Sequence, residues 1–167
     1  MAKYSALDIA NFYVELANSI PNDSIDNLKL NKLCYYAQGW NLAKNGYPLF
    51  DETIEAWRYG PLVPSVYRAF KACGNQPIAE AIAHFDEARL SQEELLLLTD
   101  VYITYGKYSS RGLMDKTHEP GTPWSKVFVD MQNNPISQDS LRDYFSQSNE
   151  LESMELHISP ENVLNYA

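Results

Sequence analysis

The sequence predicts a mainly α-helical protein, a compact multi-helix domain built around a central helix at residues 28–45, with a small β-hairpin at about residues 48–59. Apolar side chains recur at helical spacing in several separate segments of the chain. Residues 28–45 are apolar on two faces, which is typical of a helix with neighbours on both sides. The 167 residues, 45% of them hydrophobic, are enough to build an independent core.

The central helix carries two apolar stripes. One consists of Leu30, Leu33, Cys34, Ala37 and Trp40, and the other of Leu28, Tyr35 and Leu42, with Asn31 and Gln38 between them. Asp26 or Asn27 can cap its beginning, and Gly46 supplies a left-handed end. We therefore expect the rest of the chain to wrap around this helix.

Other helices are predicted from start and stop signals. Ser5 can cap the first one and Pro21 ends it, while Ser91 with Glu94 forms a capping-box pattern. Pro64 can open a helix that ends at Gly74. In order, these helices are expected at residues 5–20, 64–74, about 79–84, 91–105, 109–116 and 123–127, followed by a short one that Ser137 caps.

The segment between the central helix and Pro64 has a different pattern. Residues 53–59 alternate as a short strand does, and residues 47–50 precede the polar pair Asp51-Glu52. We expect a two-stranded hairpin that turns at Asp51-Glu52 and is broken by Gly60-Pro61.

The net charge of −9 lies entirely in residues 72–167, because residues 1–71 hold seven basic and seven acidic side chains. Such a surface repels polyanions, so nucleic-acid binding is not expected, whereas a basic protein partner would be steered towards it. No apolar run is long enough for a membrane span, and residues 1–12 lack the apolar stretch of a signal peptide. We expect a cytoplasmic protein without membrane contact.

Catalytic and metal-binding motifs are not found. The sequence has no nucleophile elbow, no zinc-protease helix, no P-loop and no dinucleotide-binding loop. His84, His118 and His157 are far apart, and none has a second ligand three or four residues away. Cys34 and Cys73 are expected as small buried thiols. We expect no enzyme activity, no cofactor and no metal.

Two segments are candidates for partner binding. Trp57, Arg58 and Tyr59 follow one another at the end of the predicted strand, and these three types dominate binding hot spots. The alternative is that Trp57 belongs to the core and that Arg58 pairs with Glu55 or Glu52. Tyr67 follows in the same block of sequence, and we include it among the candidate binding residues.

The second candidate segment contains His118, Glu119 and Trp124. Its proline and glycine content predicts a fixed loop, and fixed loops position functional side chains well. The alternative is a structural corner with Trp124 packed and His118 hydrogen-bonded. An enzyme that uses His118 and Glu119 as a proton-transfer pair is a third, weaker possibility.

The sequence also resembles a known family. The runs KLNKLCYYAQGW (residues 29–40), GYPLF (46–50) and IEAWRYGPLVPSVY (54–67) are similar in content and order to the SocA-like Panacea domain, which includes phage-associated proteins of the GepA type. The segment from Thr117 to Trp124 resembles a later motif of that family. The resemblance covers about residues 5–145, and residues 146–167 are expected as an acidic C-terminal extension.

This resemblance implies a helical antitoxin of a type II toxin–antitoxin pair, often carried on prophages, that neutralises a cognate toxin by direct contact. It also implies an alternative, because a SocA-type member is an adaptor that delivers its toxin to a protease. In that case the acidic residues Glu150, Glu152 and Glu155 would be the natural tether. Neither alternative requires a cofactor.

Overall fold

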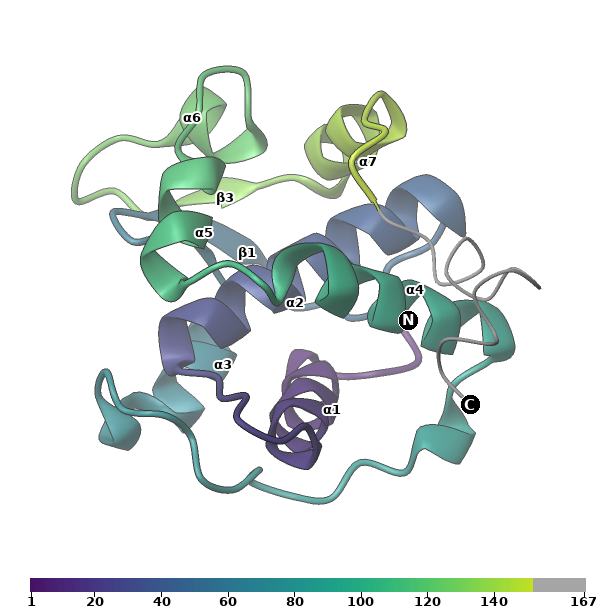
Figure 1. Ribbon diagram of the computed structural model, residues 1–167. Helices are drawn as coiled ribbons and strands as arrows, with labels where there is room; N and C mark the ends of the chain where they lie inside the picture. Colours follow the sequence, from purple (N-terminus) through teal and green to yellow (C-terminus); the bar gives the residue numbers. More distant parts are fainter. Residues whose placement is uncertain (152–167) are drawn as a thin grey trace.

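Helix α2 (Asn27–Lys44) runs through the middle of the molecule, as the computed structural model of residues 1–151 shows (Figure 1). It contacts α1, α3, α4, α5, α7 and strand β2, and nearly all of its side chains are buried. Asp26 caps its first turn, and Gly46 after its end has a φ of +87°. The prediction of a central helix covered on both sides is confirmed.

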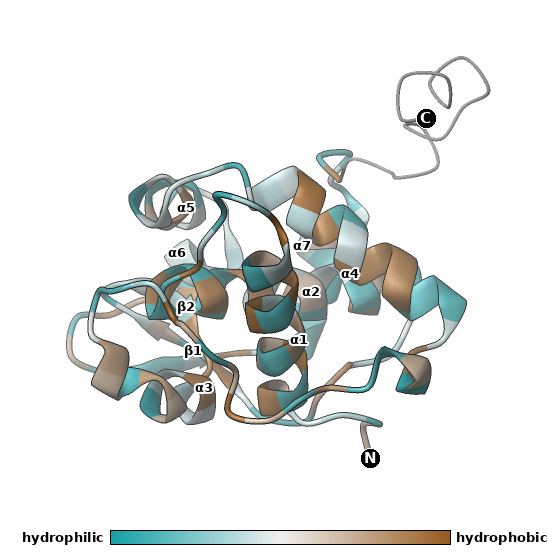
Figure 2. Cartoon of the chain, turned by 60° about the horizontal axis from the view of Figure 1, so that its bottom comes forward, coloured by the Kyte–Doolittle hydropathy of each residue, from teal (hydrophilic) through white to brown (hydrophobic). Residues whose placement is uncertain are grey.

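The mainly helical class is confirmed as well. The other α-helices of the described residues are α1 (Ala6–Ser19), α3 (Pro64–Ala69), α4 (Gln92–Tyr105), α5 (Ser110–Thr117), α6 (Pro123–Val127) and α7 (Gln138–Ser146), with 3-10 turns at Lys71–Cys73 and Glu87–Arg89. Capping boxes begin α1 at Ser5 and α4 at Ser91. Hydrophobic and polar residues alternate along α1 and α4 in Figure 2, as they do in helices with one side in the core.

Polar side chains of α2 hold the segments that follow it. The Gln38 side chain accepts a hydrogen bond from Leu49 N and donates one to Phe50 O, and the Asn41 side chain donates to Tyr47 O. Asn31 Oδ1 accepts from Val63 N. These bonds satisfy the polar residues between the two apolar stripes, and they fix the chain after α2 against the helix.

The predicted hairpin exists, but its position along the chain was wrong. Strand β1 (Ile54–Trp57) pairs with β2 (Gly60–Leu62), and the turn lies at Arg58-Tyr59 rather than at Asp51-Glu52. Residues 47–50 cannot join the sheet because α2 already binds their backbone groups. Gly60 does not break the hairpin: its φ of +100° suits the end of the tight turn.

Strand β3 (Asn134–Ile136) pairs with the other side of β1, so the antiparallel sheet has the order β2-β1-β3. This strand was not predicted, because three residues with a proline in the middle give almost no alternating pattern. Pro61 and Pro135 both lie on edge strands, where a missing backbone N–H is tolerated.

The helix predicted at about residues 79–84 is not formed. Side chains of α1 bind the backbone of this segment instead: Asn18 donates to Ala79 O, Asn11 accepts from Ile82 N, and Glu15 accepts from Phe85 N. These backbone groups therefore pair with α1 and leave no helical bonds to form. The strand-like alternation of Met154, Leu156 and Ile158 lies outside the described residues.

Helix α7 packs on α2 through an aromatic contact. An added Cβ on Gly39 would lie 2.2 Å from Phe145 Cε2, so only glycine allows the Phe145 ring to approach α2 this closely. On the side of α4, the ring of Tyr36 stacks on that of Tyr105 with centroids 3.6 Å apart.

None of the helices between residues 1 and 151 combines the length and apolarity that a membrane crossing needs.

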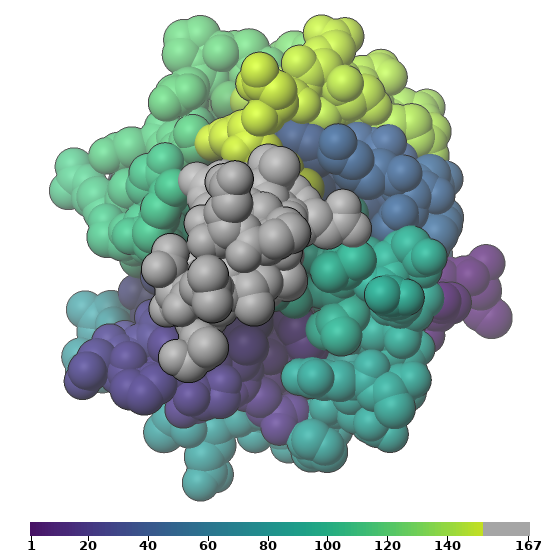
Figure 3. All heavy atoms as spheres, turned by 45° about the vertical axis from the view of Figure 1, so that its right-hand side comes forward, coloured from purple at the N-terminus to yellow at the C-terminus, as the bar shows by residue number. Residues whose placement is uncertain are grey.

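A buried carboxylate joins three distant parts of the chain. Glu94 on α4 is fully buried and accepts hydrogen bonds from Tyr4 Oη at 2.7 Å and from Tyr47 Oη at 2.8 Å. Its oxygens also lie within 3.1 Å of Lys3 Nζ. In Figure 3, the teal surface on the side of α4 lies beside the blue segment around the end of α2.

Candidate partner-binding site

The two candidate segments of the sequence meet in space. The Trp124 indole Nε1 donates a hydrogen bond to Trp57 O at 2.6 Å, which joins α6 to the end of β1 across 67 residues of sequence. Figure 1 shows α5 and α6 next to the sheet, on the side of α2 opposite to α4's beginning. The predicted binding residues Trp57 and Trp124 therefore belong to one site.

Rings stack on both sides of this hydrogen bond. His118 and Trp124 are parallel, with centroids 3.8 Å apart and an interplanar angle of 7°, and Trp124 stacks on Phe128 at 4.3 Å. The Tyr67 ring of α3 lies 5.4 Å from that of Trp57. We call this set the aromatic ladder: Tyr67, Trp57, Trp124, His118 and Phe128.

Local sequence explains why α6 holds its tryptophan in place. The Thr122 hydroxyl caps the helix by accepting from Ser125 N, and Pro123 occupies the first turn. Gly121 before the cap has a φ of +84°, which glycine adopts readily. Trp124 is only 9% exposed, as the structural alternative for this segment predicted, but His118 Nε2 lacks the hydrogen bond that the same alternative included.

The hairpin turn is the exposed part of the site. Arg58 and Tyr59 are exposed, and the Arg58 guanidinium lies 5.9 Å from the centre of the Tyr59 ring. Trp57 is half-buried, and its Nε1 donates to Glu55 Oε2 at 2.7 Å. Within residues 1–151, Arg58 forms no ion pair with Glu55 or Glu52, so the pairing considered from the sequence is not made.

His118 and Glu119 are neighbours in sequence but do not act as a pair in the structure. Glu119 is exposed, whereas His118 Nε2 is buried and points to the interior of the site. In the part of the chain that the structure describes, no hydrogen bond joins the two side chains. Burial lowers the pKa of His118, and the positive charge of Lys32 lowers it further, against the opposite effect of Asp115.

Sequence reasoning missed Phe128 and the loop after it. Phe128 follows Trp124 by four residues, a helical spacing that could have identified it. The pairing of Ala56 with Asn134 places the chain before Asn134 beside the end of β1, next to the hairpin turn. Val129 and Met131 of this loop are 47% and 93% exposed, so the loop presents apolar side chains to solvent.

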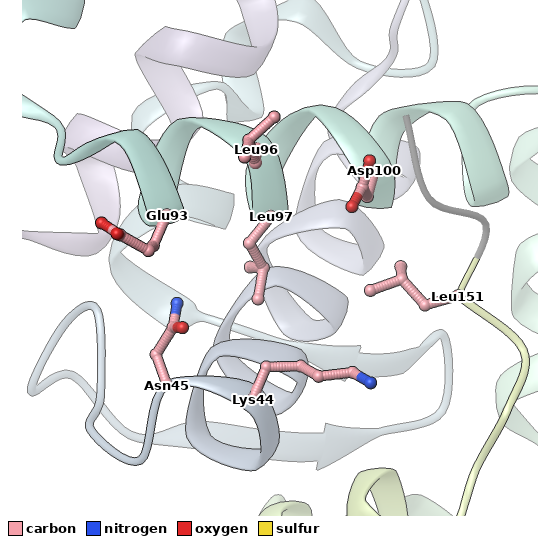
Figure 4. A pocket seen from close by; sticks show the side chains of 7 residues that line it. All are labelled: Lys44, Asn45, Glu93, Leu96, Leu97, Asp100 and Leu151. Atoms are coloured by element: carbon pink, nitrogen blue, oxygen red, sulfur yellow. The ribbon is translucent and has the colours of Figure 1, made fainter. Parts of the chain in front are cut away.

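A separate hollow of about 300 Å³ lies between the end of α2 and α4 (Figure 4). Glu93, Leu96, Leu97 and Asp100 line it from α4, and Lys44, Asn45 and Leu151 line it from the other side. It contains none of the residues predicted to bind a partner. The described residues also contain no cluster of three or more His, Cys, Asp or Glu side chains that could hold a metal ion.

Comparisons with known proteins identify the family. The profile of the family described as "Antitoxin SocA-like, Panacea domain" matches residues 30–125, which include every predicted binding residue. The chain is also 32% identical to the Antitoxin SocA of Caulobacter vibrioides (strain NA1000 / CB15N) over 130 residues, which cover 71% of this chain and 68% of that protein. No solved structure matches. The chain therefore belongs to the SocA-like Panacea domain family.

Proposed function

We propose that this protein is the antitoxin of a type II toxin–antitoxin pair and neutralises its toxin by direct contact. Membership of the SocA-like Panacea family and the similarity to a protein named Antitoxin SocA support this role. The proposed contact surface consists of Trp57, Arg58, Tyr59 and Tyr67, with Glu119 at its edge. His118 and Trp124 support the surface from beneath.

The observation that supports the hairpin as the contact surface is the hydrogen bond from Trp124 to Trp57 O. It holds an exposed Arg-Tyr turn and a half-buried tryptophan on a stacked, rigid support. Binding such a surface requires little ordering of side chains, so more of the contact energy remains as affinity. A few tryptophan, tyrosine and arginine side chains commonly supply most of the affinity of an interface of about 800 Å² per partner.

Co-expression with the product of the neighbouring gene tests the proposal. The neighbour alone should stop growth, and this chain should restore growth and co-purify with it. If the neighbour is harmless alone, or remains toxic in the presence of this chain, the proposed function is wrong.

Substitutions in the hairpin locate the surface. We expect Trp57→Ala and Arg58→Ala each to weaken binding of the purified neighbour by tenfold or more, since hot-spot truncations typically remove over ~1.4 kcal/mol. Arg142→Ala on α7 is the matched control, because Arg142 pairs only with Asp139 one turn before it among the described residues. Equal affinities for the Arg58 and Arg142 variants would exclude the hairpin as the contact surface.

The adaptor alternative predicts a different outcome. If neutralisation is direct, the purified antitoxin should block the toxin without any protease, and removal of residues 146–167 should leave this inhibition unchanged. Inhibition that depends on a protease, or on residues 146–167, would replace direct neutralisation by delivery to a protease.

A further inference from the structure

Two buried nitrogen atoms, one within the aromatic ladder and one beside it, have no protein hydrogen-bond partner. Lys32 of α2 is completely buried, and its Nζ contacts no acceptor. His118 Nε2 is in the same situation, and of the buried side-chain nitrogen and oxygen atoms in residues 1–151 these are the two that lack a partner. Because nearly all buried polar groups are hydrogen-bonded, this pair needs an explanation.

The two side chains meet where α2, β2 and α5 join. An added Cβ on Gly60 would lie 2.6 Å from Lys32 Cε, 3.3 Å from its Nζ and 2.8 Å from Thr117 Oγ1. The backbone at the start of β2 therefore closes directly over the Lys32 amine, beside the residue that precedes His118. No other residue type fits at position 60 without a shift of Lys32 or Thr117.

The surrounding charges do not neutralise this pair. On α2, Asp26 favours the charged form of Lys32, but burial outweighs it and lowers the pKa of Lys32 to about 7. On α5, Asp115 favours the charged form of His118, yet burial and Lys32 lower the pKa of His118. Strand β2 carries no titratable side chain, and α6 presents Trp124 to the histidine. Burial therefore opposes protonation of both groups near neutral pH, and the charge of Lys32 further opposes protonation of His118.

His118 is the member of the pair that can move. Lys32 lies in the middle of the buried central helix, whereas His118 is the half-buried C-cap of α5 at the edge of the molecule. A charged His118 gains hydration by turning outwards. That movement separates its ring from Trp124, whose indole holds the end of β1 through Trp57 O.

We propose that Lys32 and His118 form a pH-dependent switch beneath the aromatic ladder. When the pair takes up protons, His118 leaves its stacked position on Trp124, and the ladder no longer presents Trp57 and the hairpin turn for binding. The control of partner binding rests on the proposed function, but the movement of His118 does not. The two can therefore be tested separately.

A pH titration of the free full-length chain by NMR tests the movement. The indole N–H signal of Trp124 should be constant near pH 8 and should shift or broaden as the pH falls below about 6.5, the ordinary pKa of histidine, because burial and Lys32 lower the pKa of His118. Trp40 is the internal reference: its Nε1 donates to Tyr105 Oη in the buried core, away from the pair, so its signal should stay constant.

Three variants assign the transition. His118→Gln should abolish the change at Trp124, and Lys32→Met should move its midpoint to higher pH, because the charge that opposes His118 protonation is gone. His84→Gln is the matched control, since His84 is exposed and bonded to Glu15. This control should leave the transition unchanged. A constant Trp124 signal in the wild type, or equal midpoints in the wild type and Lys32→Met, would overturn the switch.

Binding of the purified neighbouring gene product gives the second readout. We expect the wild type to bind it more weakly at pH 5 than at pH 8, by about threefold or more, and Lys32→Met to show this weakening at higher pH than the wild type. If Trp124 moves but affinity is equal at both pH values, the ladder does not control binding and the proposal is wrong. If nothing binds at any pH, the proposed function fails, while the NMR titration still decides whether His118 moves.

Discussion

Glu94 and Lys32 are both ionisable and both completely buried, but their surroundings are opposite. Glu94 accepts hydrogen bonds from Tyr4, Tyr47, Ser91 N and Lys3, whereas the Lys32 amine has no protein acceptor. The carboxylate connects the N-terminus, the segment after α2 and α4. The amine lies beneath the surface proposed to bind a partner. Breaking a hydrogen-bonded buried charge is strongly destabilising, while a buried polar group without a partner lowers stability and is typical of functional sites.

The largest effect is expected from Glu94→Ala. The substitution leaves Tyr4, Tyr47 and Lys3 without their shared acceptor, so we expect the free energy of unfolding to fall by about 3–5 kcal/mol. Urea unfolding of the wild type and the variant measures this difference in stability. Glu93→Ala is the control, because Glu93 is exposed one residue earlier on the same helix, and it should change stability by less than about 0.5 kcal/mol. Similar losses in the two variants would show that the buried network does not contribute.

Lys32→Met should have the opposite sign and stabilise the protein by about 2–4 kcal/mol at pH 7, because a buried amine without an acceptor is replaced by an apolar side chain of similar length. Lys29→Met is the matched control on the same helix. Lys29 Nζ donates to Gly106 O at 2.6 Å, so its loss should not stabilise the protein. A destabilised Lys32→Met variant would contradict our view of the amine as unsatisfied.

The gain from Lys32→Met should also depend on pH. The folded state releases the Lys32 proton at about pH 7, and the unfolded state holds it up to the ordinary pKa of 10.5. The unfolded state therefore binds more protons between these values, and wild-type stability rises with pH in this window. Consequently the advantage of Lys32→Met should be greatest at and below pH 7 and should shrink towards pH 10.5. A constant advantage would exclude titration of Lys32 as its cause.

The smallest effect concerns acid. Burial raises the pKa of Glu94, but the bonds from Ser91 N, Tyr4, Tyr47 and Lys3 outweigh it and lower this pKa to about 2. Glu94 thus contributes stability above the unfolded pKa of about 4.5, which is lost as the pH falls towards 2. Between pH 4.5 and 3 we expect the wild type to lose about 1–2 kcal/mol through this group. The stability of Glu94→Gln should fall less over this pH range than that of the wild type. The same loss of stability in both proteins would contradict the role of Glu94.

The same contrast explains what could be predicted from sequence. The Ser91–Glu94 capping box is a local pattern, and the structure contains it, but the bonds of Glu94 to Tyr4 and Tyr47 span 90 and 47 residues. Such contacts depend on how helices pack, which spacing does not encode. The sequence does not indicate that Lys32 is buried without a partner, because lysine is almost never fully buried in proteins.

Within the candidate site, residue types were predictable but their arrangement was not. Trp57 and Trp124 were identified separately as candidates, and their hydrogen bond follows from the packing of α6 against the sheet. The position of the hairpin was missed because side chains of α2 bind residues 47–50. Phe128 was not predicted because it lies one residue beyond the helix expected at residues 123–127.

Hydrogen–deuterium exchange of this chain, alone and bound to the neighbouring gene product, tests the central claim most directly. We expect binding to protect residues 54–62 and 117–131, which contain the hairpin and most of the aromatic ladder, and to leave the beginning of α4 around Glu94 unchanged. Protection confined to the α4 side, with unaltered exchange in the hairpin, would contradict the proposal that the aromatic ladder forms the partner-binding surface.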